Sequence, residues 1–433
     1  MRSFRWCHVS KLFAVLLLPL CSGCKEMAQV SVPVTFNDAA LEHAVKAALR
    51  LPDDTVLTSD LMLELTDLAI WEYGTDVSDL TGLEYAFNLD WLDISGGHIR
   101  SLAPIERLPR LQTLRLGGCP LDESGTFSNW PALEELWLVG TRAQQFKVID
   151  MPKLRTVWNK NRSGPGTDET ISVEVIGCPV LEEVMMEDYG ATALIVEDCA
   201  SLRKLDIGGL PLIGVRLSNL PALKSLSLTE GALSYIDLSG LTSLTGLNLR
   251  GNQLMAIDLE PVPLLKFLIL SGNNFSEIDL SPVPDLKNLQ LGGNPLNAIN
   301  LEGNPLLSEL YLQDTTLTSL DLTHQAYLTR LDLTSSPVGE VNLDSNPELQ
   351  YLFLDDTEIS TLNHAAGLEH VIALLARRNQ IEYLTPLFAW PNLADAYIDV
   401  TQNPLSLESL CEEIPEMRAL GTRVIVSGQE WCR

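Results

Sequence analysis

The sequence predicts a solenoid, in which short coils of chain stack side by side and each adds one strand to a curved parallel sheet. Two observations predict it: a leucine pattern recurs without interruption, and its step is 21 residues every time. The eight blocks of this series begin at Leu202, Leu223, Leu244, Leu265, Leu286, Leu307, Leu328 and Leu349. A step of this length has no room for a full helix, so we expect extended or 3₁₀ turns on the return side.

Each block fits L-x-x-L-x-L-x-x-N-x-L, which is the leucine-rich repeat, and Asn252, Asn273 and Asn294 stand at its ninth place. Side chains alternate along a strand, so places four and six point inward while places three and five point outward. The ninth-place asparagine is expected to satisfy backbone groups that turn inward at the bend. The same place is taken elsewhere by Cys119, Thr315, Ser336 and Thr357.

Less regular blocks extend the series in both directions, from Leu65 to the last block at Asp395. The block at Leu154 is lengthened by an insertion at 161–167. We count about 16 coils over residues 65–405. The chain resembles bacterial internalin-type leucine-rich-repeat proteins over nearly all its length after the leader. The resemblance implies a concave strand face that serves attachment to other proteins, and a cap at each end.

Residues 1–24 read as a lipoprotein signal peptide, and residues 25–36 as a tether. Basic residues precede an apolar run that is too short to cross a bilayer as a helix. The small residues before Cys24 resemble a bacterial lipoprotein signal, which implies lipidation of Cys24, although Cys21 stands where such signals usually have leucine. Lys25 follows instead of aspartate, and the resemblance then favours the outer membrane. We therefore expect an exported envelope protein whose only membrane contact is a lipid anchor.

The ends of the repeat are expected to carry structural caps at 37–64 and 406–433. Asn37 or Asp38 can cap a first helix, and a second short helix can begin at Ser59. The closing cap reads as a helix that Pro415 can split, followed by a strand at 424–426. Such caps cover leucine edges that would otherwise be open.

Charge and motifs exclude several classes of function. The net charge of −28 repels phosphate backbones, so no nucleic-acid partner is expected. The sequence contains no recognisable catalytic or zinc motif, so we expect neither enzymatic activity nor a bound metal or cofactor. The protein is expected to be a monomer. A row of acids and amides on the return strands leaves calcium binding open as an alternative. The row consists of Asp237, Asp258, Asp279, Asn300, Asp321, Asn342 and Asn363. A short second strand is predicted around each of the first six, at 236–238, 257–259, 278–280, 299–301, 320–322 and 341–343.

The cysteines suggest two disulfides. Cys178 and Cys199 are 21 residues apart, so stacking would bring their Cα atoms within bridging distance. Cys411 and Cys432 lie within the closing cap and could staple it. An exported location permits both bonds, with buried or free thiols as the alternative. Cys119 reads as core filling.

The candidate binding residues are large side chains at the outward places three and five. Exposed aromatic side chains on neighbouring strands are typical of binding hot spots. The candidates are Trp91, Trp137, Trp158, Met185, Phe267, Tyr311, Tyr351, Phe353 and Tyr397. The alternative is that neighbouring loops cover some of them, or that they only raise strand propensity. Acidic neighbours at Asp314, Asp332, Asp355 and Asp356 would suit a basic partner.

The sequence therefore predicts a non-enzymatic scaffold in the bacterial envelope that binds a protein partner, basic or aromatic, with its concave face. Binding of glycan or peptidoglycan by the same face is one alternative, since sugars also stack on tryptophan. A structural role in the envelope without a specific ligand is the other.

Overall fold

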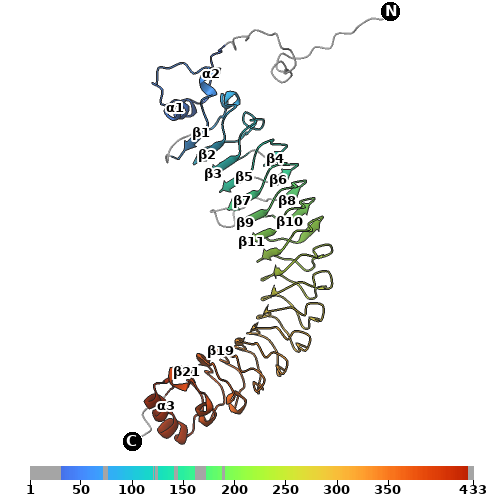
Figure 1. The fold of residues 1–433 in the computed structure, drawn as a ribbon, viewed down its shortest axis with the longest axis vertical. Helices are drawn as coiled ribbons and strands as arrows, with labels where there is room; N and C mark the ends of the chain where they lie inside the picture. Colours follow the sequence, from blue (N-terminus) through green and yellow to red (C-terminus); the bar gives the residue numbers. More distant parts are fainter. Residues whose placement is uncertain are drawn as a thin grey trace, which may run out of the picture.

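The structure is a computed structural model, and it describes residues 31–71, 77–119, 121, 125–140, 145–160, 172–187 and 191–427. Within these ranges the chain forms an arc of stacked coils, with the first and the last described residues at opposite ends of the arc (Figure 1). The described helices are all too short or too polar to cross a membrane. The predicted signal peptide, Cys24 and Cys432 lie outside the described residues.

A parallel sheet of 17 strands lines the concave side of the described chain. Its strands follow in chain order and in register, so that Trp137 pairs with Trp158, and Trp158 with Met185. The longer strands come first: β1 (Asp67–Ile70), β2 (Trp91–Ser95), β3 (Thr113–Gly117), β5 (Glu135–Val139), β7 (Thr156–Lys160), β9 (Glu183–Glu187), β11 (Lys204–Gly208) and β13 (Ser225–Thr229). Three-residue strands complete it: β14 (Gly246–Asn248), β15 (Phe267–Ile269), β16 (Asn288–Gln290), β17 (Glu309–Tyr311), β18 (Arg330–Asp332), β19 (Tyr351–Phe353), β20 (Ala373–Leu375), β21 (Tyr397–Asp399) and β22 (Arg423–Ile425). The predicted curved wall of strands is confirmed.

A second parallel sheet lies on the opposite side of the coils, but only in the first half of the arc. It consists of β4 (Thr126–Ser128), β6 (Gln145–Ile149), β8 (Ser172–Ile176), β10 (Ala193–Glu197) and β12 (Gly214–Ser218). The return strands predicted in the regular coils, from 236–238 to 341–343, are absent from this described region, and that prediction is wrong. The segments there form no paired strands.

The geometry of an arc explains where the second sheet stops. Hydrogen-bonded strands lie about 4.8 Å apart, so two paired sheets on opposite sides of a coil hold the stack nearly straight. Curvature requires wider spacing on the outer side, which breaks that ladder. The side chains of Asp237, Asp258 and Asp279 instead accept hydrogen bonds from the backbone N–H two residues on, at 2.9 to 3.0 Å, and turn the chain locally.

Leucines at the inward places form one continuous core, and the ninth-place asparagines tie its coils together. Asn273 Nδ2 donates to the carbonyls of Leu249 and Leu270, both at 2.9 Å, and its Oδ1 accepts from Leu254 N–H at 3.1 Å. Asn252 and Asn294 make the same set of contacts one coil away. The predicted structural role of this place is confirmed.

A second polar ladder lies on the return side, and the sequence reading missed it. Asn304, Gln325 and Asn346 are buried and 21 residues apart. The amide of each donates to two backbone carbonyls of the preceding coil, as Asn346 does to Leu322 and Gln325 at 3.0 and 2.9 Å. The sequence shows the 21-residue spacing of these three residues. Valines hold the same place in the two coils before them, however, so that the place was taken to be apolar.

A left-handed turn follows most strands at place eight of the repeat. Gly251, Gly272 and Gly293 have φ between +67° and +70° there, which glycine adopts without strain. Later coils place Asp314, Ser335 and other non-glycine residues in the same conformation. The path of the coil therefore imposes the left-handed conformation at this place, whichever residue stands there.

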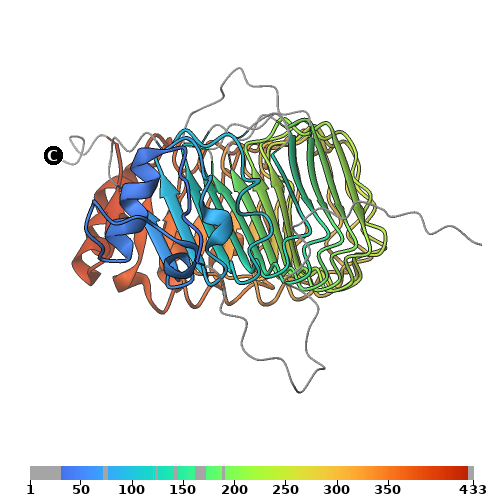
Figure 2. The same cartoon turned by 90° about the horizontal axis from the view of Figure 1, so that it is seen from above.

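Short helices close both ends of the solenoid. α1 (Ala39–Ala48) begins at the Asp38 cap, which accepts hydrogen bonds from the N–H groups of Ala40 and Leu41, and it lies across the first coils with α2 (Ser59–Met62) (Figure 2). At the other end a π-helical turn η5 (Ser409–Glu413) leads into α3 (Ile414–Leu420), with Pro415 in its first turn and Gly421 at its end. The 3₁₀ turns are η1 (Leu83–Tyr85), η2 (Asn363–Ala365), η3 (Thr385–Ala389) and η4 (Leu393–Asp395).

Candidate binding face

Three of the candidate residues form a ladder on β5, β7 and β9. The rings of Trp137 and Trp158 lie 4.8 Å apart between centroids, inclined by 42°. Trp158 Nε1 lies 3.1 Å from the sulfur of Met185 on the next strand. All three side chains are half-buried, so their outer surfaces face solvent on the concave side and neither ring is sunk among the leucines.

Arg115 extends this ladder on the N-terminal side, and the sequence reading missed it. Its guanidinium lies 5.1 Å from the ring centroid of Trp137 and 6.0 Å from that of Trp91. Its Nε is buried, with no hydrogen-bond partner among the described residues. The two indole faces therefore supply most of the favourable contact for this cation. Trp91 also packs edge-on against Trp71, at 6.3 Å.

A second cluster lies on β17, β18 and β19. Arg330 stands 4.5 Å from the ring centroid of Tyr351 and 5.9 Å from that of Phe353. Tyr311 donates to Glu309 Oε2 at 3.1 Å; burial and this neighbouring carboxylate both raise the pKa of Tyr311. An arginine, an acid and three aromatic rings therefore share one exposed surface. In both clusters an arginine lies on the strand next to the aromatic residues. The constant repeat length could have predicted this neighbourhood from the sequence.

The remaining two candidates stand apart from these clusters. Phe267 on β15 is 52% exposed, which makes it the most exposed of the nine. Tyr397 on β21 is half-buried beneath Arg423, whose guanidinium lies 5.2 Å from the ring centroid. The structure thus places all nine candidates on one sheet face but gathers them into separate groups.

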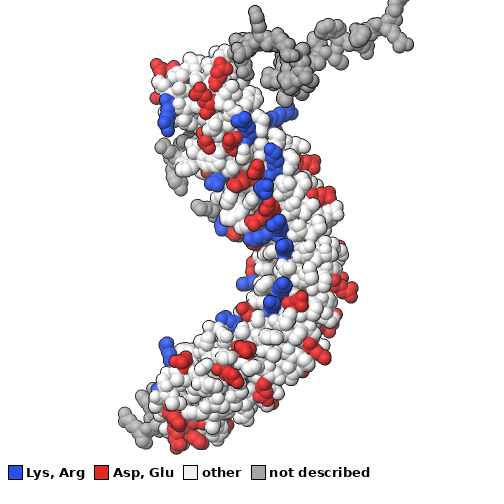
Figure 3. Space-filling view, in the orientation of Figure 1, with Lys and Arg blue, Asp and Glu red and all other residues white. Residues whose placement is uncertain are grey.

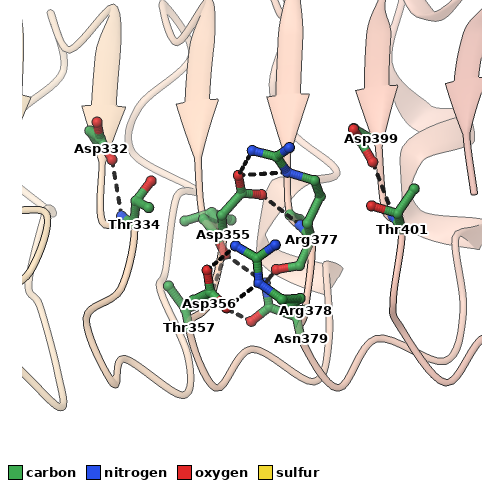
Figure 4. A network of polar contacts seen from close by, with 12 residues as sticks. Asp332, Thr334, Asp355, Asp356, Thr357, Arg377, Arg378, Asn379, Asp399 and Thr401 are labelled. Atoms are coloured by element: carbon green, nitrogen blue, oxygen red, sulfur yellow. Dashed lines mark hydrogen bonds and ion pairs between the residues drawn. The ribbon is translucent and has the colours of Figure 1, made fainter.

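Three of the four acidic neighbours are less available than the sequence suggested, whereas Asp314 is exposed. Asp355 is buried, and Arg377 pairs with it through Nε, Nη2 and its own backbone N–H, at 2.5 to 2.8 Å (Figure 4). Arg378 pairs with Asp356 beside it, and Asp332 accepts a hydrogen bond from Thr334 N–H at 3.0 Å. These carboxylates stabilise turns between coils, and arginines of this chain already neutralise two of them.

The described free cysteines, Cys119, Cys178 and Cys199, are buried. Burial raises the pKa of the Cys119 thiol to about 11. Cys178 and Cys199 lie against each other as free thiols in the structure, unlike the predicted disulfide. A hydrogen bond between the two sulfurs raises the pKa of Cys178 and lowers that of Cys199. The Cys411–Cys432 bond stays a prediction, because Cys432 lies outside the described residues.

No group of three or more metal-ligating side chains occurs in the described parts of the chain. The row from Asp237 to Asn342 is exposed, and its side chains are used in local turns. The hydrogen bonds that Ser239, Ser281 and Thr323 donate lower the pKa values of Asp237, Asp279 and Asp321. Stacked aromatic rings and arginines are suited to binding by contact, and they do not form an arrangement of acid, base and nucleophile.

Comparison with known proteins places the fold. No family model matches the sequence, and no curated protein matches it. Among solved structures, the functional domain of InlJ from Listeria monocytogenes, which includes a cysteine ladder, is 21% identical, with a TM-score of 0.55 over 84% of this chain and 80% of that one. A leucine-rich-repeat protein of Leptospira interrogans is 17% identical, with a TM-score of 0.58 over 85% of this chain and 97% of that one. The chain has the leucine-rich-repeat fold, and the bacterial proteins that share this fold with it include an internalin.

Proposed function

We propose that this protein is a non-enzymatic scaffold that binds a protein partner through its concave sheet. The observation that carries the proposal is the Trp137–Trp158 pair, half-exposed on adjacent strands with Arg115 and Met185 on either side. A rigid backbone ladder fixes these side chains before any partner arrives. Little conformational entropy is then lost on binding.

The proposal extends to location. A chain with this leader would be exported and held to the outer membrane by lipid on Cys24. Replacing Cys24 with serine should release the protein from the membrane fraction into the soluble one. Retention of the Cys24→Ser variant in the membrane fraction would contradict the lipid anchor.

The binding proposal is tested by capture from cell-surface extracts. Trp137→Ala/Trp158→Ala removes both rings of the ladder but leaves the inward leucines in place. Tyr235→Ala/Tyr327→Ala is a matched control, because these two aromatics are exposed by 69% and 61% and lie outside the concave sheet. We expect the ladder variant to lose partners that the control and the original protein retain.

Equal recovery of the same partners by all three proteins would remove the ladder from the binding site. Release of the captured material by neutral sugars would instead favour glycan binding, because a tilted tryptophan pair can also stack on sugar rings. Circular dichroism of each variant should first show an unchanged fold.

A further inference from the structure

The middle of the concave side carries charge opposite to that of the molecule as a whole. The first six places of the five blocks that begin at Leu202, Leu223, Leu244, Leu265 and Leu286 contain five basic residues and one acidic residue, in a protein of net charge −28. We define the basic strip as Arg203, Lys204, Lys224, Lys266 and Lys287. Figure 3 shows basic side chains gathered along the inner part of the middle coils and acidic ones along the outer edge.

The backbone holds four of these residues in one line. Place two of each coil donates its N–H to the carbonyl of place two in the coil before, at 2.9 Å, from Arg203 through Lys224, Thr245 and Lys266 to Lys287. Successive places are therefore about 4.8 Å apart, and the strip is about 20 Å long. It follows one rim of the concave sheet, where each strand begins.

The cations of this line have no partners of their own. Arg203, Lys224, Lys266 and Lys287 are exposed, and none forms an ion pair or side-chain hydrogen bond within the described chain. Lys204, the fifth residue of the strip, is paired: its Nζ lies 3.6 Å from Asp206 Oδ2. Other described cations of the same face are used: Arg155 pairs with Glu182 at 2.6 Å. Neighbouring like charges repel each other and destabilise a sheet, so structure alone gives no reason for this row.

The surface beside the strip suits a short peptide. Phe267 is exposed next to Lys266, and it pairs in register with Gly246, which leaves one side of the ring uncovered. Serine, asparagine and glutamine side chains on the neighbouring strands offer donors and acceptors to a peptide backbone. They are Ser225, Ser227, the Asn248 amide nitrogen and the Gln290 amide oxygen, whereas the Asn288 amide already donates to Glu309 and accepts from Gln290.

Acids bound the strip at both ends. Glu182 and Glu183 lie on the coil before Lys204, and Glu309 lies on the coil after Lys287. A long polyanion would extend onto these carboxylates and onto the acidic outer surface. A short anionic segment would not, because about six extended residues cover the strip.

From this juxtaposition we infer that the basic strip binds an acidic, extended peptide segment of the partner, with carboxylates on the lysines and an apolar side chain on Phe267. This inference rests on the proposed function and names the chemistry of the partner. The expectation of a basic partner concerned the acids from Asp314 to Asp356, further along the chain, whereas the free charges of the basic strip are positive.

The test uses a fluorescently labelled peptide of about eight residues, in which glutamate and serine alternate on either side of one central leucine. The full-length protein is titrated into this peptide at low ionic strength, and binding is measured by fluorescence anisotropy. Lys224→Gln/Lys266→Gln/Lys287→Gln should weaken binding by about tenfold or more. Arg100→Gln/Arg107→Gln/Arg110→Gln changes the net charge equally at exposed positions outside the strip, and it should change affinity by less than about twofold.

Three outcomes would overturn the inference. They are no binding of the glutamate peptide, equal weakening by both triple variants, and tighter strip-dependent binding of heparin or single-stranded RNA than of the peptide. A lysine–serine peptide of the same length should not bind. Peptide binding reports on the strip alone, and capture by the Trp137→Ala/Trp158→Ala variant reports on the ladder, so failure of one is distinguishable from failure of the other.

Discussion

Asn273 shows how one side chain joins two coils of this solenoid. It satisfies one N–H and one carbonyl of the coil before, and one carbonyl of its own coil. Without the amide, the buried Leu254 N–H would lose its acceptor, and the carbonyls of Leu249 and Leu270 would each lose one of their two amide donors. The repeat motif predicts this role because a short amide side chain offers two donor hydrogens and an acceptor oxygen at that bend.

Replacing Asn273 with alanine should therefore lower the free energy of unfolding by about 2–3 kcal/mol. Asn274→Ala is the control, because the neighbouring side chain is exposed, and it should cost less than about 0.5 kcal/mol. Urea unfolding of the three proteins measures both values. Equal stabilities for the two variants would refute the proposed role of the ladder.

Glu413 is the corresponding residue of the closing cap. Its buried carboxylate accepts hydrogen bonds from Leu384 N–H at 2.9 Å, Ser409 Oγ at 2.5 Å and Thr385 Oγ1. Burial alone would raise its pKa, but these donors lower it below the usual value. A carboxyl whose pKa is lowered by folding stabilises the fold above its unfolded pKa, and that stability is lost as the pH falls through the folded pKa.

Glu413→Gln should thus destabilise the protein by about 1–2 kcal/mol at neutral pH, and by progressively less as the pH falls below about 4.5. Thermal unfolding over a pH series measures this difference. The exposed Glu408→Gln serves as the control. A difference between Glu413→Gln and the original protein that stays constant down to low pH would contradict the assignment.

At the scale of elements, two adjacent arginines make ion pairs of different burial on neighbouring coils. The side chain of Asp355, which pairs with Arg377, is only 5% exposed to solvent, whereas that of Asp356, which pairs with Arg378, is 35% exposed. Removing the partner of a buried charge is costly, but removing the partner of an exposed one is not.

Arg377→Ala should therefore destabilise the coil by about 3 kcal/mol, and Arg378→Ala by less than about 1 kcal/mol. Hydrogen exchange at the backbone amides of β19 and β20 would show the same contrast locally. Similar effects of the two substitutions would mean that burial of Asp355 does not control the strength of this contact.

The elements also show what the sequence could predict. The 21-residue step was enough to place Trp137 beside Trp158, because register in a stacked sheet follows directly from the repeat length. The second sheet of β4, β6, β8, β10 and β12 was not predictable in this way. Its existence depends on the spacing between coils on the outer side, which is set by the curvature of the whole stack and not by any single block.

Side-chain partners were harder still to predict. Arg115 and Arg330 were overlooked because a basic residue at an outward place looks solvated until its neighbour in the next coil is considered. Asp355 was expected to be available to a partner, yet the chain pairs it with Arg377. Such pairings depend on both members lying at compatible places in adjacent coils, so they require the register and not only the motif.

At the scale of the whole molecule, the arc separates two surfaces with different properties. The concave sheet carries the aromatic clusters and the basic strip, and in the middle coils acids lie along the outer edge (Figure 3). A partner held by the concave face would meet a preformed surface of stacked rings and unpaired cations. The outer coils would then serve to hold that surface in its curved shape.

Photo-crosslinking tests the central claim, that the concave sheet is the contact surface. A photoreactive residue is placed at Thr156 or Ser227, on outward places of β7 and β13, or at the exposed Glu260 or Glu302 outside the concave sheet. We predict that irradiation in cell-surface extract yields the same partner from the two concave positions and none from the outer ones. Crosslinks that form only from Glu260 or Glu302 would contradict this account of the protein.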